Sequence, residues 1–188
     1  ESLRQISGID SDTFEKTSTA IRTRGFWLGT NLITALIAAS VINIFKDTLE
    51  QVIFLAVLMP IIASMGGVAA TQTLTITVRG LALGQIVKAN YLYLFNRELI
   101  VGISNGFLWA VILSLIACTW FQDWLLAWVI CLSMIINLTA GVLSGMGIPI
   151  LLRSLKLDPA VAGSVIVTTV TDVIGFFSFL GLASYFYS

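Results

Sequence analysis

Five long apolar runs dominate this chain of 188 residues. A transmembrane helix needs about 20 predominantly apolar residues, and each run is long enough. Charged residues make up only 11% of the sequence, whereas a soluble domain carries about 25%. We therefore expect an all-α, polytopic membrane protein whose five transmembrane helices occupy Phe26–Ile44, Gln51–Val78, Leu99–Trp120, Trp124–Ile150 and Pro159–Tyr187.

Polar segments separate these runs. Three of them, "FKDTLE", "FQD" and "RSLKLD", are brief. The fourth, "RGLALGQIVKANYLYLFNRE", is partly apolar and predicts either an interfacial helix or the beginning of a long third helix. Residues 1–24 are polar and mixed in charge, which predicts a cytosolic lead-in before a transmembrane domain over residues 25–188.

The basic residues are distributed unevenly between the two sides of the expected membrane domain. Lys46 is alone on one side, and the other nine of the ten are on the opposite side: Arg4, Lys16, Arg22, Arg24, Arg79, Lys88, Arg97, Arg153 and Lys156. Lys and Arg mark the cytoplasmic side. The pattern predicts a cytoplasmic amino terminus and an external carboxyl terminus, in a plasma membrane such as the bacterial inner membrane.

Several function classes receive no support from the sequence. It contains no histidine, and Cys118 and Cys131 fall inside apolar runs, where a buried thiol is expected. The formal net charge is zero, which does not favour binding to nucleic acid. No combination of nucleophile and base and no phosphate-binding loop is recognisable, so we do not expect an enzyme.

Asp172 is the one acidic residue expected deep in the membrane. It follows Pro159 by 13 residues, about 20 Å along a helix, whereas the other nine acids fall in loops, tails or helix ends. No Lys or Arg falls in a predicted helix interior. A charge at this depth costs about 2.5–3.5 kcal/mol. Asp172 is therefore either protonated and buried as a structural hydrogen-bond donor, or exposed to water and a cation.

The neighbours of Asp172 favour water and a cation. Thr168, Thr169 and Gly175 lie three or four residues away and share its helix face. Small and hydroxylic side chains leave room for solvent. Threonine hydroxyls also bond locally to the backbone and loosen a helix, which leaves carbonyl oxygens approachable.

The second run carries a matching polar stripe. Pro60 removes a backbone hydrogen bond and predicts a kink. Beyond it, Ser64, Gly67, Thr71 and Thr75 recur at helical spacing, with Gln72 beside them. Broken or polar backbone at membrane depth lies in protein or beside a water-filled cavity. We expect these residues to line a pore, although packing of small residues between helices is an alternative for the glycines.

Small residues also recur in the third and fourth runs. Their spacing is typical of close helix packing, which we expect for Gly102, Asn105, Gly106, Asn137, Gly141 and Gly145.

Two stretches closely resemble the transmembrane domain of the MgtE family of magnesium channels: "LAVLMPIIASMGGVAATQTLTITVRGLALGQI" and "LDPAVAGSVIVTTVTDVIGFF". The resemblance runs from about Gly25 to the end of the chain. It implies a homodimer with five helices per subunit and a pore on the two-fold axis, lined by the second and fifth helices. It also implies cytosolic amino-terminal and CBS domains in a full-length protein, which are absent from these 188 residues.

The resemblance assigns roles to particular residues. Asp172 matches the selectivity-filter carboxylate of the family, with Thr168 offering a backbone carbonyl one turn earlier. Ser64, Gly67 and Thr71 match pore-facing positions. Two departures stand out, because the usual "GGNAG" of the family is "GGVAA" here, with Val68 for Asn and Ala70 for Gly.

We therefore expect a magnesium-selective channel that conducts hydrated Mg²⁺ into the cell between paired Asp172 carboxylates. Mg²⁺ prefers six oxygen ligands and gives up water reluctantly, so a filter can hold the hydrated ion. The same oxygens can hold Mn²⁺, Co²⁺ or Ca²⁺. Two alternatives remain open: a proton-coupled secondary divalent-cation transporter with Asp172 as the carrier, and a structural membrane domain.

Overall fold

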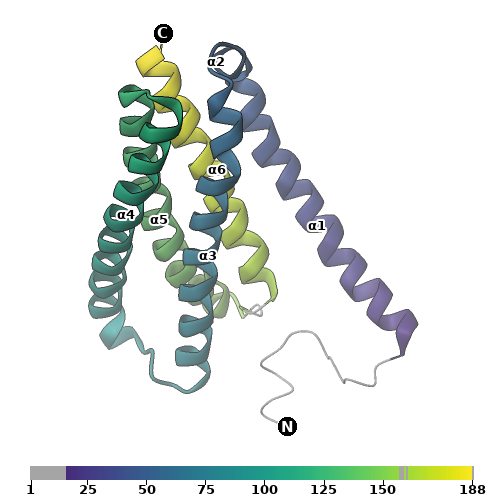
Figure 1. Ribbon diagram of the computed structural model, residues 1–188. Coiled ribbons are helices and arrows are strands. Elements are labelled where there is room, and N and C mark those ends of the chain that lie inside the picture. The colour runs from purple at the N-terminus through teal and green to yellow at the C-terminus, as the bar shows by residue number, and fades with distance from the viewer. Residues whose placement is uncertain (1–15, 157–158, 160, 188) are drawn as a thin grey trace.

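The computed structural model describes residues 16–156, 159 and 161–187, which form helices joined by short turns (Figure 1). The elements are α1 (Thr17–Ile44), α2 (Lys46–Gln51), α3 (Phe54–Ala82), the 3₁₀ turn η1 (Lys88–Asn90), α4 (Tyr91–Phe121), α5 (Trp124–Ser154) and α6 (Val161–Tyr187). Within these residues, five helices are long and apolar enough to cross a membrane and no strand occurs. The predicted all-α architecture with five spanning helices is confirmed.

Two helices begin well before their predicted limits. α1 begins at Thr17 rather than Phe26, and α4 begins at Tyr91 rather than Leu99. Of the two readings of the partly apolar break, the long third helix is therefore correct. A helix continues past the apolar core of its sequence as long as its polar residues reach water. Arg97 and Glu98 therefore lie within α4, whereas the sequence analysis places both in the break before the third run.

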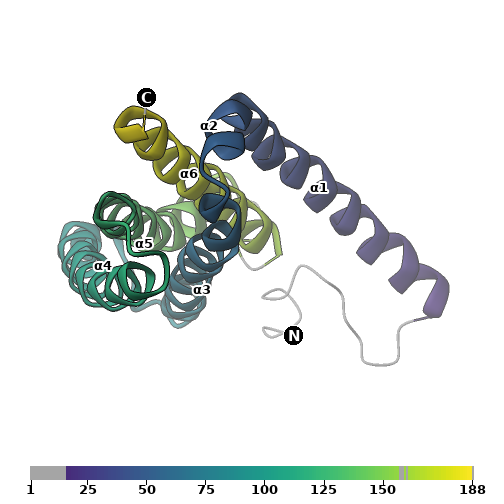
Figure 2. The same cartoon turned by 45° about the horizontal axis from the view of Figure 1, so that its top comes forward.

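Helix α5 is the centre of the bundle, because it packs against α3, α4 and α6 (Figures 1 and 2). Its contacts with α3 are close enough to exclude side chains. A Cβ atom built on Gly145 would collide with the carbonyl oxygen of Ala70 and lie 3.0 Å from Leu74 N. A Cβ atom built on Gly102 or on Gly106 of α4 would likewise lie 3.1 Å from a backbone Cα atom of α5. Helices in lipid associate through this kind of packing rather than through the hydrophobic effect.

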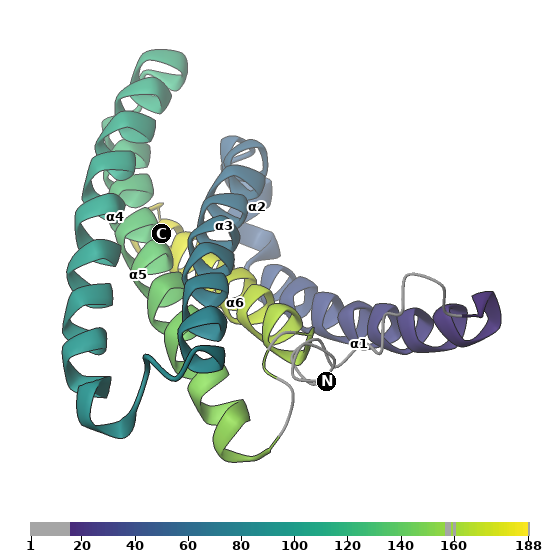
Figure 3. The ribbon, with the colours of Figure 1, turned by 90° about the horizontal axis from the view of Figure 1, so that it is seen from below.

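Helix α1 lies apart from the other helices. It packs against α6 and projects away from the bundle (Figure 3). Only 6% of its most apolar window is buried. Large apolar side chains such as Phe26, Leu32 and Leu36 are more than half exposed along it. This surface requires lipid or another protein chain.

The two ends of the bundle differ in charge. The connection between α3 and α4, the end of α5 and the beginning of α1 lie at one end, and α2 and the end of α6 lie at the other (Figure 1). Arg153 in the last turn of α5 donates a hydrogen bond at 2.5 Å to the carbonyl of Leu81 at the end of α3, which also accepts from the Gly84 amide at 3.2 Å. Lys46 begins α2 at the opposite end. Arg4 lies outside the described residues.

Candidate functional site

Asp172 lies midway along α6. It follows Val161 by 11 residues and precedes Tyr187 by 15, which places it about 16 Å and 22 Å from the two helix ends. Its side chain is partly exposed. Within the part of the chain that the structure describes, no side-chain hydrogen bond or ion pair to Asp172 is found, and no three His, Cys, Asp or Glu residues gather into a metal site. The carboxylate is therefore open to a ligand from outside this chain.

Threonine hydroxyls bond to the α6 backbone one turn before Asp172. Thr168 Oγ1 donates to the carbonyls of Ser164 at 3.0 Å and Val165 at 3.1 Å. Thr169 Oγ1 donates to the Val165 carbonyl at 2.6 Å. Each hydroxyl proton is thus used within the helix, and the lone pairs of each hydroxyl oxygen remain for water. This is the local bonding that the sequence predicts for a loosened, wet helix face.

Thr171 makes a third bond of this kind, which the sequence analysis did not consider. Its side chain is fully buried, and its Oγ1 donates to the carbonyl of Thr168 at 2.9 Å. In an α-helix that carbonyl also accepts the N–H of Asp172. Both lone pairs of the Thr168 carbonyl are therefore occupied in this conformation. It can reach a cation only as a shared acceptor, or after the Thr171 hydroxyl turns away.

The polar stripe of α3, defined as Ser64, Gly67, Thr71 and Thr75, lies on an open face. Ser64, Thr71 and Thr75 are exposed and Gly67 is partly exposed. Thr71 Oγ1 donates to the Gly67 carbonyl at 2.8 Å, and Thr75 Oγ1 donates to the Thr71 carbonyl at 2.9 Å. The hydroxyls are bonded as in α6, so the stripe presents acceptor oxygens outward.

The polar stripe borders α6 beside Asp172. A Cβ atom built on Gly67 would lie 3.9 Å from Thr171 Oγ1, an ordinary van der Waals contact. Thr171 immediately precedes Asp172. The structure therefore brings together two polar segments that are about 100 residues apart in the sequence. At this contact Gly67 of the polar stripe lies beside the buried Thr171, and the partly exposed Asp172 is the next residue along α6.

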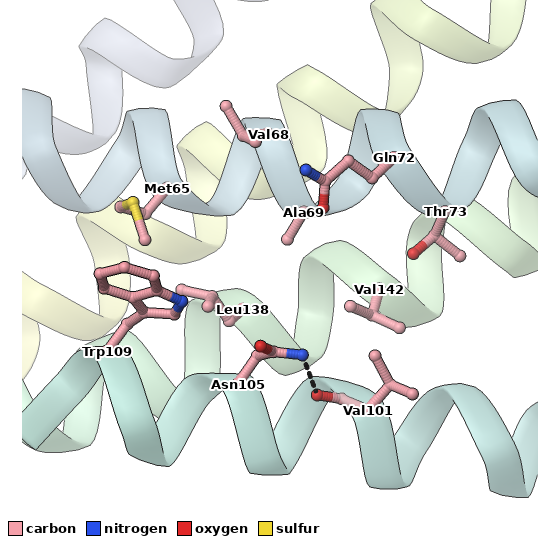
Figure 4. A pocket seen from close by; sticks show the side chains of 10 residues that line it. All are labelled: Met65, Val68, Ala69, Gln72, Thr73, Val101, Asn105, Trp109, Leu138 and Val142. Carbon is pink, nitrogen blue, oxygen red and sulfur yellow. Dashed lines mark hydrogen bonds between the residues drawn. The ribbon is translucent and has the colours of Figure 1, made fainter.

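Two residues expected to line the pore face elsewhere. Gly175 is buried against α5, where a Cβ atom built on it would lie 3.1 Å from Asn137 Cγ. Gln72 lines a groove of about 340 Å³ between α3 and α4, together with Asn105 and Trp109 (Figure 4). Both expectations used helical spacing, which defines neighbours along a helix but does not say which neighbouring helix each residue meets.

The residues expected to pack helices also divide into two groups. The glycines and Asn137 lie at contacts between helices. Asn105 does not, because its side chain is exposed in the groove and its Nδ2 donates to the Val101 carbonyl of its own helix at 3.1 Å (Figure 4). Of the two departures from the family pattern, Val68 lines the same groove at 53% exposure and Ala70 is buried against α5.

Glu98 is a second buried acid that the sequence analysis missed. It is the eighth residue of α4, and its side chain is 6% exposed. Its Oε1 lies 3.4 Å from Nη1 of Arg97, whose own side chain is half exposed. The signal that would have found Glu98 is the apolar segment "YLYLF", which extends the third helix toward the amino terminus.

Asp123 is held at the opposite end of the bundle from Arg153. Its Oδ1 caps α5 by accepting from the amides of Leu125 at 2.8 Å and Leu126 at 3.1 Å, and its Oδ2 accepts the hydroxyl of Tyr187. Burial alone would raise the pKa of Asp123. The hydrogen bonds from Tyr187 and from the two amides outweigh burial and lower the pKa below its ordinary value of 3.8. The carboxylate therefore ties the end of α6 to the beginning of α5.

Comparison with known proteins gives a consistent result. The model of the MgtE family, described as "Divalent cation transporter", matches residues 59–182. A protein of Bacillus subtilis named "Magnesium transporter MgtE" is 34% identical over 180 residues, which cover 96% of this chain and 40% of that protein. A protein of the same name from Enterococcus faecalis is 29% identical over 96% of this chain and 40% of its own length. Another from Thermus thermophilus is 29% identical over 84% of this chain and 35% of its own length. The chain thus spans about 40% of the length of these relatives or slightly less.

Proposed function

The chain belongs to the MgtE family of divalent cation transporters, and from this premise we propose that it forms the membrane pore of a magnesium channel. Hydrated Mg²⁺ would pass through this pore into the cell. One observation carries the proposal. Asp172 lies midway along the membrane-spanning helix α6 without a side-chain hydrogen bond or ion pair among the described residues, and the residue before it, Thr171, meets the polar stripe of α3 at Gly67.

The proposed filter holds the ion through its water. Mg²⁺ keeps several of its six waters because dehydration is costly. Carboxylate and hydroxyl oxygens can accept hydrogen bonds from those waters without stripping them. The relevant acceptors are Asp172, Thr168 and Thr169 on α6 and the polar stripe on α3.

A second copy of the chain completes the site in this proposal. Any carboxylate attracts a doubly charged ion about twice as strongly as a singly charged one at the same distance, and two facing carboxylates double the energy difference between the two ions. The exposed polar stripe of α3 and the partly exposed Asp172 of α6 would face the same residues of a partner across a two-fold axis. The exposed apolar surface of α1 is also available to a partner or to lipid.

We propose further that the chain is embedded in the plasma membrane with its amino terminus in the cytoplasm. The support is the excess of basic residues at the end of the bundle that contains Arg79, Lys88 and Arg153. Residues 1–24 would then be a cytosolic lead-in to the transmembrane domain of residues 25–188. The remaining length of the relatives would correspond to cytosolic regulatory domains.

The test is Mg²⁺ flux through the protein reconstituted in liposomes, with a fluorescent indicator inside and a membrane potential set by potassium and valinomycin. Asp172→Asn and Asp172→Ala are expected to reduce flux at least about tenfold, the effect of removing about 1.4 kcal/mol of ion stabilisation. Glu50→Gln, an exposed acid in α2, is the control and should leave the flux unchanged.

Three outcomes separate the candidate functions. Voltage-driven Mg²⁺ currents that disappear with Asp172 support the channel. Flux that requires a proton gradient and saturates would instead support the coupled transporter. Normal flux in both Asp172 variants would show that Asp172 has a structural role, and the filter assignment would be wrong.

A further inference from the structure

Asn137 is a polar residue at the point where α3, α5 and α6 meet. It lies on α5 and is fully buried. Its Nδ2 donates to the carbonyl oxygen of Ile62 on α3 at 2.8 Å. Ile62 lies two residues after Pro60, whose missing N–H leaves the carbonyl of the preceding turn, at Ala56, without its helical partner. The amide of Asn137 joins α5 to α3 by a side-chain hydrogen bond just beyond this proline.

Two glycines enclose the Asn137 side chain from opposite helices. A Cβ atom built on Gly66 of α3 would collide with it, lying 2.6 Å from Asn137 Cγ. A Cβ atom built on Gly175 of α6 would lie 3.1 Å from the same atom. The amide group is therefore held between the backbones of α3 and α6. Its size determines how closely those two helices can approach each other.

The hydrogen bonding of Asn137 is only half satisfied. No donor in the described part of the chain reaches its Oδ1, which is buried. A buried acceptor without a partner costs about 1–3 kcal/mol. An apolar side chain would fill this space without that cost. The hydrogen bond from Asn137 Nδ2 to the Ile62 carbonyl is therefore the interaction that offsets the cost of the unpaired Oδ1.

The position of Asn137 is linked directly to that of Asp172. Thr171 and Gly175 precede and follow Asp172 on α6, and both rest on α5. Thr171 Cγ2 would lie 3.3 Å from a Cβ atom on Gly141, and Gly175 contacts Asn137. At 100° per residue these two positions share one face of α6, and Asp172 projects from the adjacent face. Asn137 and Gly141 therefore support the face of α6 that orients Asp172.

We propose that Asn137 is a positioning residue for ion selection. It fixes the separation of α3 and α6, and with it the distance between Asp172 and the polar stripe of α3. This inference rests on the proposed function of Asp172. The hydrogen bond to Ile62, rather than the volume of the side chain, is the feature that matters.

The test separates the hydrogen bond from the volume. Asn137→Ala removes both, whereas the double variant Asn137→Ala with Gly66→Ala returns a methyl group to the vacated space. Apparent KM for Mg²⁺, maximal flux and the ratio of Mg²⁺ to Ca²⁺ flux are measured in the same liposomes for each variant. Both variants are expected to raise the apparent KM about threefold to tenfold, the value of one hydrogen bond, and to lower the Mg²⁺ to Ca²⁺ ratio.

Several outcomes decide the inference. Wild-type KM and selectivity in the double variant would show that Asn137 only fills space, and would overturn it. Unchanged values in the single variant would do the same. If Asn137→Ala does not fold, the inference is tested by the double variant alone, because the methyl group added at Gly66 occupies the space left by the Asn137 side chain. Asp172→Asn is measured in parallel. Normal flux in that variant would refute the proposed filter itself. Lost flux in that variant, together with wild-type KM and selectivity in the Asn137 variants, would refute only the positioning role.

Discussion

The hydroxyl of Thr171 donates a hydrogen bond at 2.9 Å to the carbonyl oxygen of Thr168, one turn earlier in α6. Thr171 is the residue immediately before Asp172. The Thr168 carbonyl is the backbone oxygen that resemblance to the MgtE family assigns to the ion. If the proposed filter is right, the fully buried Thr171 would compete with the ion for the same acceptor. The strength with which the proposed filter holds Mg²⁺ should then depend on a residue whose side chain is buried.

Replacing Thr171 tests this competition. Thr171→Val keeps the shape and removes the hydroxyl, so one lone pair of the Thr168 carbonyl becomes free. We expect the apparent KM for Mg²⁺ to fall about twofold to tenfold, the range of one hydrogen bond. Thr171→Ser retains the donor and should behave like wild type. An increase in KM in the valine variant would mean that Thr171 supports the site rather than competing with the ion.

The polar stripe of α3 should contribute to conduction rather than to stability. Thr71→Val and Thr75→Val together replace two exposed hydroxyl groups by methyl groups of similar size. We expect single-channel conductance to decrease at least about threefold, because an apolar wall disfavours water around the hydrated ion. Thr30→Val on α1 is the matched control, since Thr30 is partly exposed and its hydroxyl also bonds to the carbonyl four residues earlier in its own helix. Equal effects of both changes would contradict pore lining.

The bond between Tyr187 and Asp123 predicts a pH-dependent contribution to stability. The pKa of Asp123 is lower in the folded protein than its ordinary value of 3.8. Its stabilising effect is therefore present above this ordinary pKa and disappears as the pH falls through the lower folded pKa. Tyr187→Phe should destabilise the protein by about 1 kcal/mol at pH 7, allowing for partial exposure.

Thermal unfolding in detergent between pH 3 and pH 7 measures this effect. The difference in melting temperature between wild type and Tyr187→Phe should narrow toward the acidic end. A difference that stays constant over the whole range would show that the tyrosine stabilises the fold by packing alone.

Two glycines of α5 provide a matched test of the contact with α3. Gly145→Ala would place a methyl group against the Ala70 carbonyl and Leu74 N, and we expect it to destabilise the protein by about 1–3 kcal/mol. A Cβ atom built on Gly147 meets nothing within 4 Å, so Gly147→Ala should be neutral or slightly stabilising through its helix propensity. Equal melting temperatures for the two variants would contradict the packing of α3 on α5.

The sequence predicts the helices well and their limits less well. Runs of apolar residues identify the spans because a bilayer requires continuous apolar length. The beginning of α4 at Tyr91 was left open, since a partly apolar segment suits an interfacial helix as well as an extended one. That ambiguity also concealed Glu98, a buried acid that lies seven residues after the beginning of α4.

The candidate site was likewise only partly predictable from the sequence. Asp172 and the polar stripe could be recognised from the sequence, because a carboxylate or a row of hydroxyl groups in an apolar run is costly wherever it points. The sequence could not show which neighbouring helix Gln72 and Gly175 face. These helices are apolar on all sides, and lipid is as apolar as the protein interior. Hydrophobicity therefore does not determine how each helix is rotated.

The sequence by itself thus determined that the chain crosses the membrane five times and carries one unpaired acid in its fifth span. The tertiary structure decided that Thr171 occupies the Thr168 carbonyl, that Gly175 turns toward α5, and that Asn137 separates α3 from α6. The last two relationships depend on the close approach of helix backbones at glycines, where Asn137 meets Gly175, 38 positions away in the chain, and Gly66, 71 positions away.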